Sequence, residues 1–296
     1  RDFDDAVLCQ FDGEHYHLDV AIADVSHWVK PGTALDQAAR ERGNSVYLPD
    51  RVLPMLPEIL SNDVCSLRPD QERFAFVCRM TFDQEGNLQD SQFVTGTICS
   101  AARLTYQEAS NHLMGIRPLS SRISDKVRHN LELLHVLAQK LTDRRLKSGG
   151  VEFSFPETQT TYRDDGWLSD IKHIDRPVAT LIIEECMLAA NVCAAQCLQK
   201  SLPVAIYRIH GAPDSDRIFE LRQVLSLFGV NMNGSSDPSA RDLSECLAEI
   251  RQASCPFETL QTLVLRCMKQ ASYSSNCAPH FALGFERYTH FTSPIR

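Results

Sequence analysis

Three carboxylates lie close together near the start of the sequence: Asp2, Asp4 and Asp5, within Arg-Asp-Phe-Asp-Asp. Carboxylates this close repel one another, and a bound cation would relieve the repulsion. Solvated acidic clusters are also common on protein surfaces, so the cluster by itself leaves a metal site and a solvated surface as alternatives. Oxygen ligands on a short segment that lacks the glycine and spacing of an EF-hand favour Mg²⁺ over Ca²⁺.

The elements that follow would hold the cluster at the mouth of a strand. Alternating apolar residues predict strands at 7–11 and 16–24, joined by Asp12-Gly13, and a second hairpin at 73–82 and 88–99. The proline-rich passage 48–57 excludes a long helix and a central strand. The remaining patterns predict extended segments at 151–155, 158–162, 167–174 and 204–209, and helices at 34–42, 106–114, 124–147, 178–200, 215–228, 241–252 and 257–270. We therefore expect a mixed α/β (α+β) fold in one domain, 1–296.

Composition restricts the class of protein. The most apolar stretch, 179–195, contains Glu184 and Glu185, so it predicts a buried helix, and we expect no membrane span. Eleven cysteines are scattered with no CxxC pair, which indicates free thiols in a reducing cytoplasm. The net charge of −8, shared equally between 1–150 and 151–296, lacks the basic excess of a non-specific RNA binder. Composition by itself therefore argues against nucleic acid.

Several short blocks with a distinctive sequence follow one another along the chain. They are Arg-Asp-Phe-Asp-Asp-Ala at 1–6, Val-Ala-Ile-Ala-Asp-Val-Ser at 20–26, Leu-Pro-Met-Leu-Pro-Glu-Ile-Leu-Ser at 53–61, Asp-Val-Cys-Ser-Leu at 63–67, Ala-Arg-Leu-Thr-Tyr at 102–106, Ile-Glu-Glu-Cys-Met at 183–187 and His-Phe-Thr-Ser-Pro-Ile-Arg at 290–296. Together the blocks resemble the RNB family, which includes bacterial ribonucleases II and R and the catalytic subunit of the exosome. Because they occur in family order and span the chain, the resemblance is specific. Arg1, Phe3 and the block at 102–106 are closer to ribonuclease R than to ribonuclease II.

The resemblance implies a Mg²⁺-dependent, hydrolytic 3′→5′ exoribonuclease that degrades single-stranded RNA to nucleoside 5′-monophosphates. In such a mechanism one metal ion activates a water molecule for in-line attack on the last phosphorus, and a second stabilises the departing 3′-oxygen. The last members of the family's acidic signature match Asp2, Asp4 and Asp5, with Asp4 as the critical carboxylate. Its first aspartate would lie upstream of Arg1, and a later catalytic glutamate would lie beyond Arg296. We therefore expect a catalytic-domain fragment, cut at both ends and inactive by itself, with cold-shock and S1-like domains outside it.

The resemblance also implies roles for residues outside the acidic cluster. Arg296, in Ser-Pro-Ile-Arg, would grip a phosphate, which suits a guanidinium fork. Tyr47 and Phe153 would stack on the terminal bases, a contact that accepts any base. For both aromatic residues a place in the hydrophobic core is the alternative. Glu184 would face the RNA, although a buried ion pair involving Glu184 or Glu185 is nearly as compatible with an apolar helix.

Three functions remain open at this point. The first is the exoribonuclease, of the ribonuclease R or the ribonuclease II type, acting as a cytoplasmic monomer on single-stranded RNA. The second is a catalytically inactive RNA-binding relative with a broken metal site, against which the intact aspartates argue. The third is an unrelated α/β protein with a Ca²⁺-binding loop near its start, which rests only on the acidic cluster and the negative charge.

Overall fold

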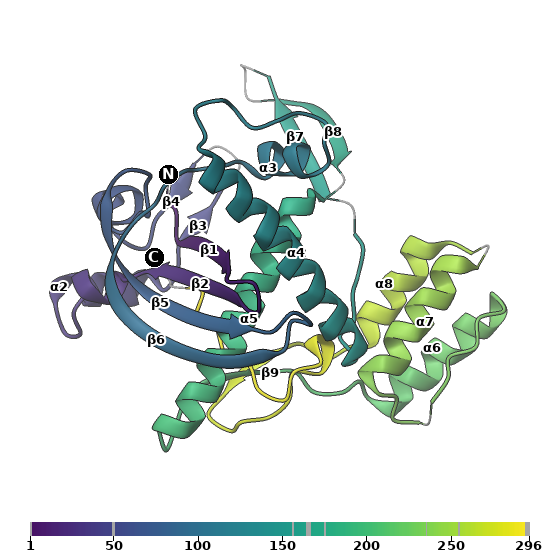
Figure 1. Cartoon of the computed structure of the whole chain (residues 1–296). Helices are drawn as coiled ribbons and strands as arrows, with labels where there is room; N and C mark the ends of the chain where they lie inside the picture. Colours follow the sequence, from purple (N-terminus) through teal and green to yellow (C-terminus); the bar gives the residue numbers. More distant parts are fainter. Residues whose placement is uncertain are drawn as a thin grey trace. The chain divides into compact units, whose positions relative to one another are not determined.

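The chain folds into two compact units (Figure 1). The structure is a computed structural model, and it describes residues 2–48, 51–155, 157–163, 167–174, 176–234, 236–253 and 255–293. The first unit consists of Arg1–Lys140, Leu181–Ala194 and His290–Arg296, and the second of Leu141–Thr180 and Ala195–Thr289. Helices and strands occur in both units, which confirms the predicted mixed α/β fold class.

A four-stranded antiparallel sheet forms the centre of the first unit, with the strand order β1-β2-β5-β6. Two hairpins build it, as the alternation of apolar residues predicts, and β2 pairs with β5 between them. The four strands are β1 (Asp5–Phe11), β2 (Tyr16–Ala23), β5 (Glu72–Phe82) and β6 (Leu88–Cys99).

Both faces of this sheet carry buried residues, because successive side chains of a strand point to opposite sides. Ala21, Ala75 and Val77 form a core cluster on one face, and Leu18 is fully buried on the other. Helix α4 (Asp125–Lys147) passes close to β1, where the side-chain amide of Asn130 donates to the carbonyl oxygen of Cys9 at 2.9 Å (Figure 1). The helix thereby fixes the strand that follows the acidic cluster.

Short helices connect the strands of the first unit. α2 (Ala34–Arg42) begins after Thr33, whose hydroxyl accepts from the Asp36 N–H, and ends at Gly43 with a φ of 76°. α3 (Tyr106–Leu113) begins with a capping box in which Thr105 and Glu108 satisfy each other's backbone N–H groups. Both helices match their predicted ranges. α1 (Val25–Trp28) is a single turn that the sequence pattern did not predict.

The proline-rich passage forms neither a long helix nor a central strand, as predicted. Its described part contains one short strand, β4 (Val52–Leu53), which pairs with β3 (Val46–Tyr47) just before the passage. A π-helix, Leu60–Val64, follows it. Such wide turns are rare and often lie near functional sites.

Helix α5 (Val178–Ser201) is strongly apolar and contributes residues to both units. By length and composition it could cross a membrane, and it is the one helix among the described residues with these properties. However, 56% of its most apolar stretch is buried inside the structure. The core helix of a folded protein has the same composition, so α5 agrees with the predicted buried helix. The expectation that the protein has no membrane span stays a prediction.

Three helices form the main core of the second unit: α6 (Ser215–Leu227), α7 (Ala240–Gln252) and α8 (Phe257–Cys267) (Figure 1). Their fully buried residues include Ile218, Leu243 and Leu260, which belong to one apolar cluster together with Val151. Ser239 and Asp242 form the capping box at the start of α7. All three helices occur where the sequence pattern predicts them.

The remaining extended segments of the second unit are short. β7 (Glu157–Tyr162) pairs with β8 (Leu168–Ile174), and β9 (Tyr207–Ile209) pairs with β10 (Ser272–Ser274). The segment 151–155, predicted as extended, joins none of these ladders. Its backbone is held instead by the side chain of Gln261, whose amide donates to the Ser154 carbonyl at 2.8 Å.

The cysteines agree with the prediction of free thiols. All eleven are among the described residues, and none forms a disulfide bond. Seven are buried, and three are exposed: Cys99, Cys197 and Cys277. The cytoplasmic location that this pattern predicts stays a prediction.

Candidate active site

The acidic segment is anchored through its backbone from two sides. The Phe3 N–H donates to the Ser66 hydroxyl at 3.0 Å, and the Phe3 carbonyl accepts from the Leu67 N–H at 2.9 Å. On the opposite side, the Asp4 carbonyl accepts from the Ala23 N–H at 2.9 Å. The Phe3 ring packs against the core cluster of the sheet. The backbone that carries the aspartates is therefore held in place by hydrogen bonds.

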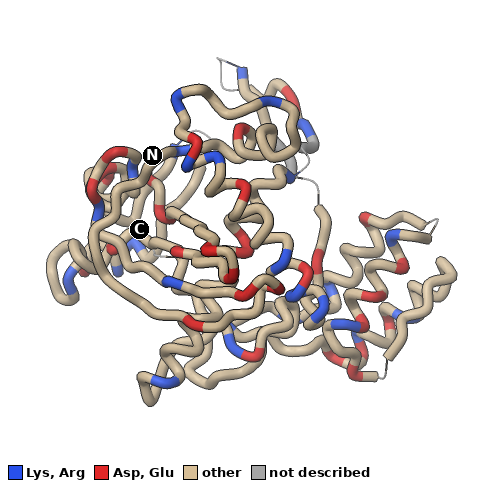
Figure 2. Tube along the Cα trace, viewed as in Figure 1, with Lys and Arg blue, Asp and Glu red and all other residues tan. Residues whose placement is uncertain are grey.

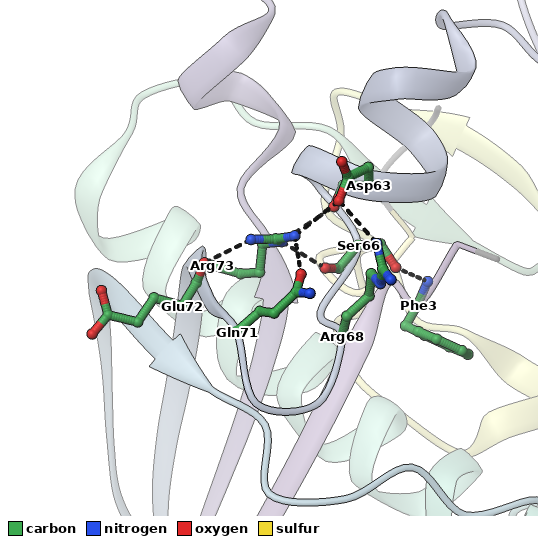
Figure 3. Close-up of polar contacts among 7 residues, drawn as sticks. All are labelled: Phe3, Asp63, Ser66, Arg68, Gln71, Glu72 and Arg73. Atoms are coloured by element: carbon green, nitrogen blue, oxygen red, sulfur yellow. Dashed lines mark hydrogen bonds and ion pairs between the residues drawn. The ribbon is translucent and has the colours of Figure 1, made fainter.

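The loop that holds Phe3 is braced by Arg73 of β5 (Figure 3). Nη2 of Arg73 lies 3.0 Å from Oδ1 of Asp63, and Nε of the same side chain donates to the Ser66 carbonyl at 3.1 Å. Arg68 forms a second ion pair with the same oxygen of Asp63 at 3.1 Å. Because the Arg73 side chain is only 19% exposed, water screens its contacts less than those of a surface pair. Arg73 thus connects the sheet to the loop that positions the acidic segment.

The three aspartates of the cluster lie in different environments. Asp2 is exposed, Asp4 and Asp5 are half-buried, and the Oδ1 atom of Asp4 is buried. Asp5 is the first residue of β1, so strand alternation places it on the same face as Val7 and Cys9. Within the part of the chain that the structure describes, no three Asp, Glu, His or Cys side chains converge as a complete metal cage.

Asp5 and Glu185 both lie near the thiol of Cys186. Cys186, on α5, is 1% exposed. Burial, followed by the charges of Cys9, Glu185 and Asp5, raises the pKa of this thiol. The thiol therefore stays protonated at neutral pH and does not supply the thiolate that a soft metal would need.

The donors present fit a hard cation. Mg²⁺ keeps several of its water ligands and takes only one or two carboxylates directly, so it does not require a converging cage. The residues that would hold it are Asp2, Asp4 and Asp5. The assignment of Asp2, Asp4 and Asp5 to Mg²⁺ stays a prediction that the donor chemistry supports.

Tyr47 in the first unit has an aromatic ring that a base could reach. The residue is 67% exposed and pairs with Val52 in the short ladder. A place in the hydrophobic core, which the sequence left open for Tyr47, is therefore excluded. Its contact with RNA stays a prediction.

Phe153 in the second unit is half-buried and packs against the helical core. Its ring lies nearly parallel to that of Phe155, with 6.0 Å between centroids and 13° between planes. Phe155 itself is 41% exposed. Phe153 thus takes the core position that the sequence left as its alternative, and stacking on RNA stays a prediction.

The segment that precedes Arg296 is held in the first unit. The Thr292 N–H donates to Oδ1 of Asn191 at 2.9 Å, and the Phe291 ring contacts that of Phe76 edge to face at 5.3 Å. Arg1 and Arg296 lie outside the described residues. The phosphate contact expected of Arg296 stays a prediction.

The two adjacent glutamates of α5 differ in burial. Glu185 is 2% exposed, whereas Glu184 is half-buried. The sequence favours Glu184 as the residue that faces RNA, and that role stays a prediction. The structure adds that Glu185 is the more deeply buried of the two, a difference that their positions in the sequence do not indicate.

The anchoring residues Ser66 and Arg73 were also missed by sequence reasoning. Ser66 belongs to the block Asp-Val-Cys-Ser-Leu at 63–67, which carried a signal of family membership but no role. In the structure Ser66 is fully buried, so its hydroxyl is available only to neighbours such as Phe3. A buried serine inside an apolar block is the sign that could have indicated an anchor.

Comparison with known proteins gives consistent matches over the whole chain. The family model of the RNB domain matches residues 1–296. Ribonuclease R of Vibrio cholerae serotype O1 and ribonuclease R of Escherichia coli K12 are each 42% identical over 297 residues, which cover 100% of this chain and 36% of each relative. Among solved structures, Mycoplasma genitalium RNase R in complex with ribose methylated single-stranded RNA matches with a TM-score of 0.94 at 30% identity, over 100% of this chain and 46% of that chain.

Fold and site together define a mixed α/β domain, in which carboxylates stand where a braced loop meets a β-hairpin. The match over the full sequence shows that the chain belongs to the RNB family. The chain spans 36% of the length of the ribonucleases R that it resembles.

Proposed function

We propose that the protein is a Mg²⁺-dependent hydrolytic exoribonuclease of the ribonuclease R type, which degrades single-stranded RNA from its 3′ end to nucleoside 5′-monophosphates. The observation that carries the proposal is the backbone anchoring of Phe3 and Asp4, which presents intact aspartates in an RNB-family chain. The 42% identity to two ribonucleases R supports the ribonuclease R type. We further propose a cytoplasmic monomer.

Each residue of the site would have its own role in phosphodiester hydrolysis. Bound Mg²⁺ would supply an activated water molecule and neutralise charge that develops on the phosphate. Asp4, with its buried oxygen, would be the least replaceable ligand, and Asp2 and Asp5 would hold the ion together with water. Tyr47 would stack on a terminal base and so align the last phosphate. Arg296 would bind a phosphate oxygen.

RNA as the substrate must be reconciled with a net charge of −8. Figure 2 shows Lys and Arg interspersed with Asp and Glu along the elements of both units. Aspartates that bind metal are part of the acidic count, so the charge understates the affinity of the loaded protein for phosphate. A related RNase R of known structure holds single-stranded RNA. These observations support RNA as the partner.

The proposal predicts a specific pattern of degradation. Incubation of the intact protein with 5′-labelled single-stranded RNA and Mg²⁺ should shorten the RNA progressively from its 3′ end, and the released product should be nucleoside 5′-monophosphate. Excess EDTA should stop the reaction. Internal cleavage, or full activity in EDTA, would contradict the proposal.

A further inference from the structure

Two buried thiols of the first unit lie against each other. Cys78 is on β5, and Cys193 is on the part of α5 that belongs to the first unit. Their exposed fractions are 0% and 1%. The thiol of Cys193 accepts a hydrogen bond from the thiol of Cys78. The two sulfur atoms are therefore neighbours, although the residues are more than a hundred positions apart in the sequence.

The register of the sheet agrees with this contact. Cys78 pairs with Val20 of β2 and with Phe93 of β6, and Ser91 of β6 pairs with the residue two positions further along β5. Because side chains alternate between the two faces of a strand, Cys78 and Ser91 share one face of the sheet. The Ser91 hydroxyl also donates to the Cys193 thiol. Contacts with two neighbouring strands thus place Cys193 over β5 and β6.

The surroundings of Cys193 favour its thiolate. The hydrogen bond from Cys78 lowers the pKa of the Cys193 thiol, burial raises it, and the hydrogen bond from Ser91 lowers it again, so that this pKa lies below its ordinary value. The thiolate is the form that reacts with a peroxide. Burial instead raises the pKa of Cys9 to about 12, and it also raises the pKa of Cys186. Cys193 is therefore better suited to react than Cys9 or Cys186.

We propose that Cys78 and Cys193 form a redox-sensitive pair, which hydrogen peroxide converts into an intramolecular disulfide that joins α5 covalently to the central sheet. The Cys193 sulfur attacks one peroxide oxygen, so that an S–O bond forms, the O–O bond breaks and the departing hydroxide takes the thiol proton and leaves as water. The Cys78 sulfur then attacks the sulfur of the sulfenic acid. An S–S bond forms, the S–O bond breaks, and the departing hydroxide takes the Cys78 proton and leaves as a second water molecule. The peroxide gains the two electrons that the two thiols lose.

Burial determines which oxidant can act on the pair. A large disulfide such as oxidised glutathione does not reach thiols that are covered by the core, whereas hydrogen peroxide is little larger than water. The new bond brings the sulfur atoms to about 2.05 Å, closer than a hydrogen bond between thiols allows, so it draws α5 toward β5. It also closes a loop of more than a hundred residues, which restricts the unfolded chain and stabilises the folded one. The inference is independent of the function proposed above.

Oxidation of the intact protein tests the pair. Brief treatment with N-ethylmaleimide first blocks the exposed thiols of Cys99, Cys197 and Cys277. Hydrogen peroxide is then added, and the protein is digested at acidic pH without reduction and analysed by mass spectrometry. We expect a cross-linked peptide that contains Cys78 and Cys193, and its loss after dithiothreitol. Two unlinked cysteines, or Cys193 as a sulfinic acid beside a reduced Cys78, would overturn the proposal.

Alanine variants provide the matched comparison. Cys78→Ala and Cys193→Ala should each abolish the cross-link. Cys186→Ala should retain it, because Cys186 is a buried cysteine of the same helix that has no part in the proposed bond. A cross-link between Cys78 and a different cysteine of the wild-type protein would contradict the proposal. Circular dichroism identifies any variant that does not fold, and the mapping of the wild-type protein decides the question even then.

Thermal unfolding provides a second readout. The oxidised wild-type protein should unfold about 5 °C above the reduced protein, because the cross-link limits the freedom of the unfolded chain. Dithiothreitol should reverse the shift, and Cys186→Ala should show the same shift as the wild-type protein. Peroxide should leave the midpoint of Cys193→Ala unchanged. An equal rise in Cys193→Ala would assign the effect to another residue and would contradict the proposal.

Discussion

Nε2 of His210 donates a hydrogen bond to the carbonyl oxygen of Lys269 at 2.6 Å. Nδ1 of the same ring accepts from the Ala282 N–H at 3.0 Å. Because the backbone N–H can only donate, Nδ1 must be the acceptor, and the proton resides on Nε2. One buried ring thus joins the end of α8 to the segment that follows His280.

This double contact predicts a large loss of stability in His210→Ala. The substitution would leave a backbone donor and a backbone acceptor without their partner, at a cost of about 2–4 kcal/mol. Urea unfolding monitored by circular dichroism measures the loss. His129→Ala, at a histidine whose side chain is 71% exposed, should change stability by less than about 0.5 kcal/mol. Equal effects of the two substitutions would show that His210 does not join these segments.

Asp4→Asn should abolish hydrolysis of RNA while RNA binding persists. The substitution keeps the shape of the side chain but removes the charge that would hold Mg²⁺, so the rate should fall by at least about 100-fold. Rates of RNA shortening and affinity in EDTA provide the two readouts. Asp90→Asn makes the same change at an exposed position of β6 and should retain activity. Undiminished decay in Asp4→Asn would favour an RNA-binding protein without catalysis.

Arg73→Gln should weaken the binding of Mg²⁺ more than it weakens the binding of RNA. Loss of the contacts to Asp63 and Ser66 would loosen the loop that anchors Phe3, and the aspartates would then be held less firmly. We expect the Mg²⁺ concentration for half-maximal activity to rise by about 10-fold, the size of effect typical of residues that support metal ligands. Arg79→Gln, also on β5 and 54% exposed, is the control. An unchanged Mg²⁺ requirement in Arg73→Gln would contradict the role of the brace.

Thiol reactivity should divide the cysteines by burial. Burial raises the pKa of Cys9 to about 12, so this thiol is protonated and shielded at neutral pH. The exposed residues Cys99, Cys197 and Cys277 should react first with Ellman's reagent in the folded protein. Mass spectrometry after brief alkylation identifies the modified residues. Early labelling of Cys9 would show that β1 opens readily.

The second unit should lose stability under alkaline conditions. Burial raises the pKa of Cys246 to about 12 and that of Cys267 to about 11. Because the pKa values are higher in the folded state than in the unfolded state, these thiols stabilise the fold fully below their unfolded pKa, and this contribution is lost as the pH rises toward 11 and 12. Urea midpoints should therefore fall above the ordinary thiol range of about 8.5. Cys246→Ala should make that decline shallower.

The sequence was sufficient to predict those helices and strands that are determined by neighbouring residues in the chain. Thr33 and Gly43 carry the cap and the stop of α2, and the apolar alternation of β1 and β2 fixes their register. The sequence pattern did not predict the conformation of segments that depend on contacts with residues far away in the chain. The π-helix Leu60–Val64 precedes a loop braced by Arg73, and the segment 151–155 is held by a glutamine more than a hundred residues away.

The same distinction, between features set by neighbouring residues and features set by distant contacts, applies to the candidate site. Asp2, Asp4 and Asp5 are adjacent in sequence, so composition and spacing indicate them directly. Glu185 could not be distinguished from Glu184, because both occupy an apolar helix and only tertiary packing buries one of them more deeply than the other.

The anchoring of Phe3 by Ser66 has a consequence for the order of folding. The two residues are 63 positions apart, so their hydrogen bond requires the closure of a long loop, which is entropically costly and slow. The aspartates next to Phe3 therefore acquire their geometry only after this loop has closed. A cation that binds this arrangement would recognise the finished fold and not the nascent chain, and its removal would shift the equilibrium toward the unfolded state.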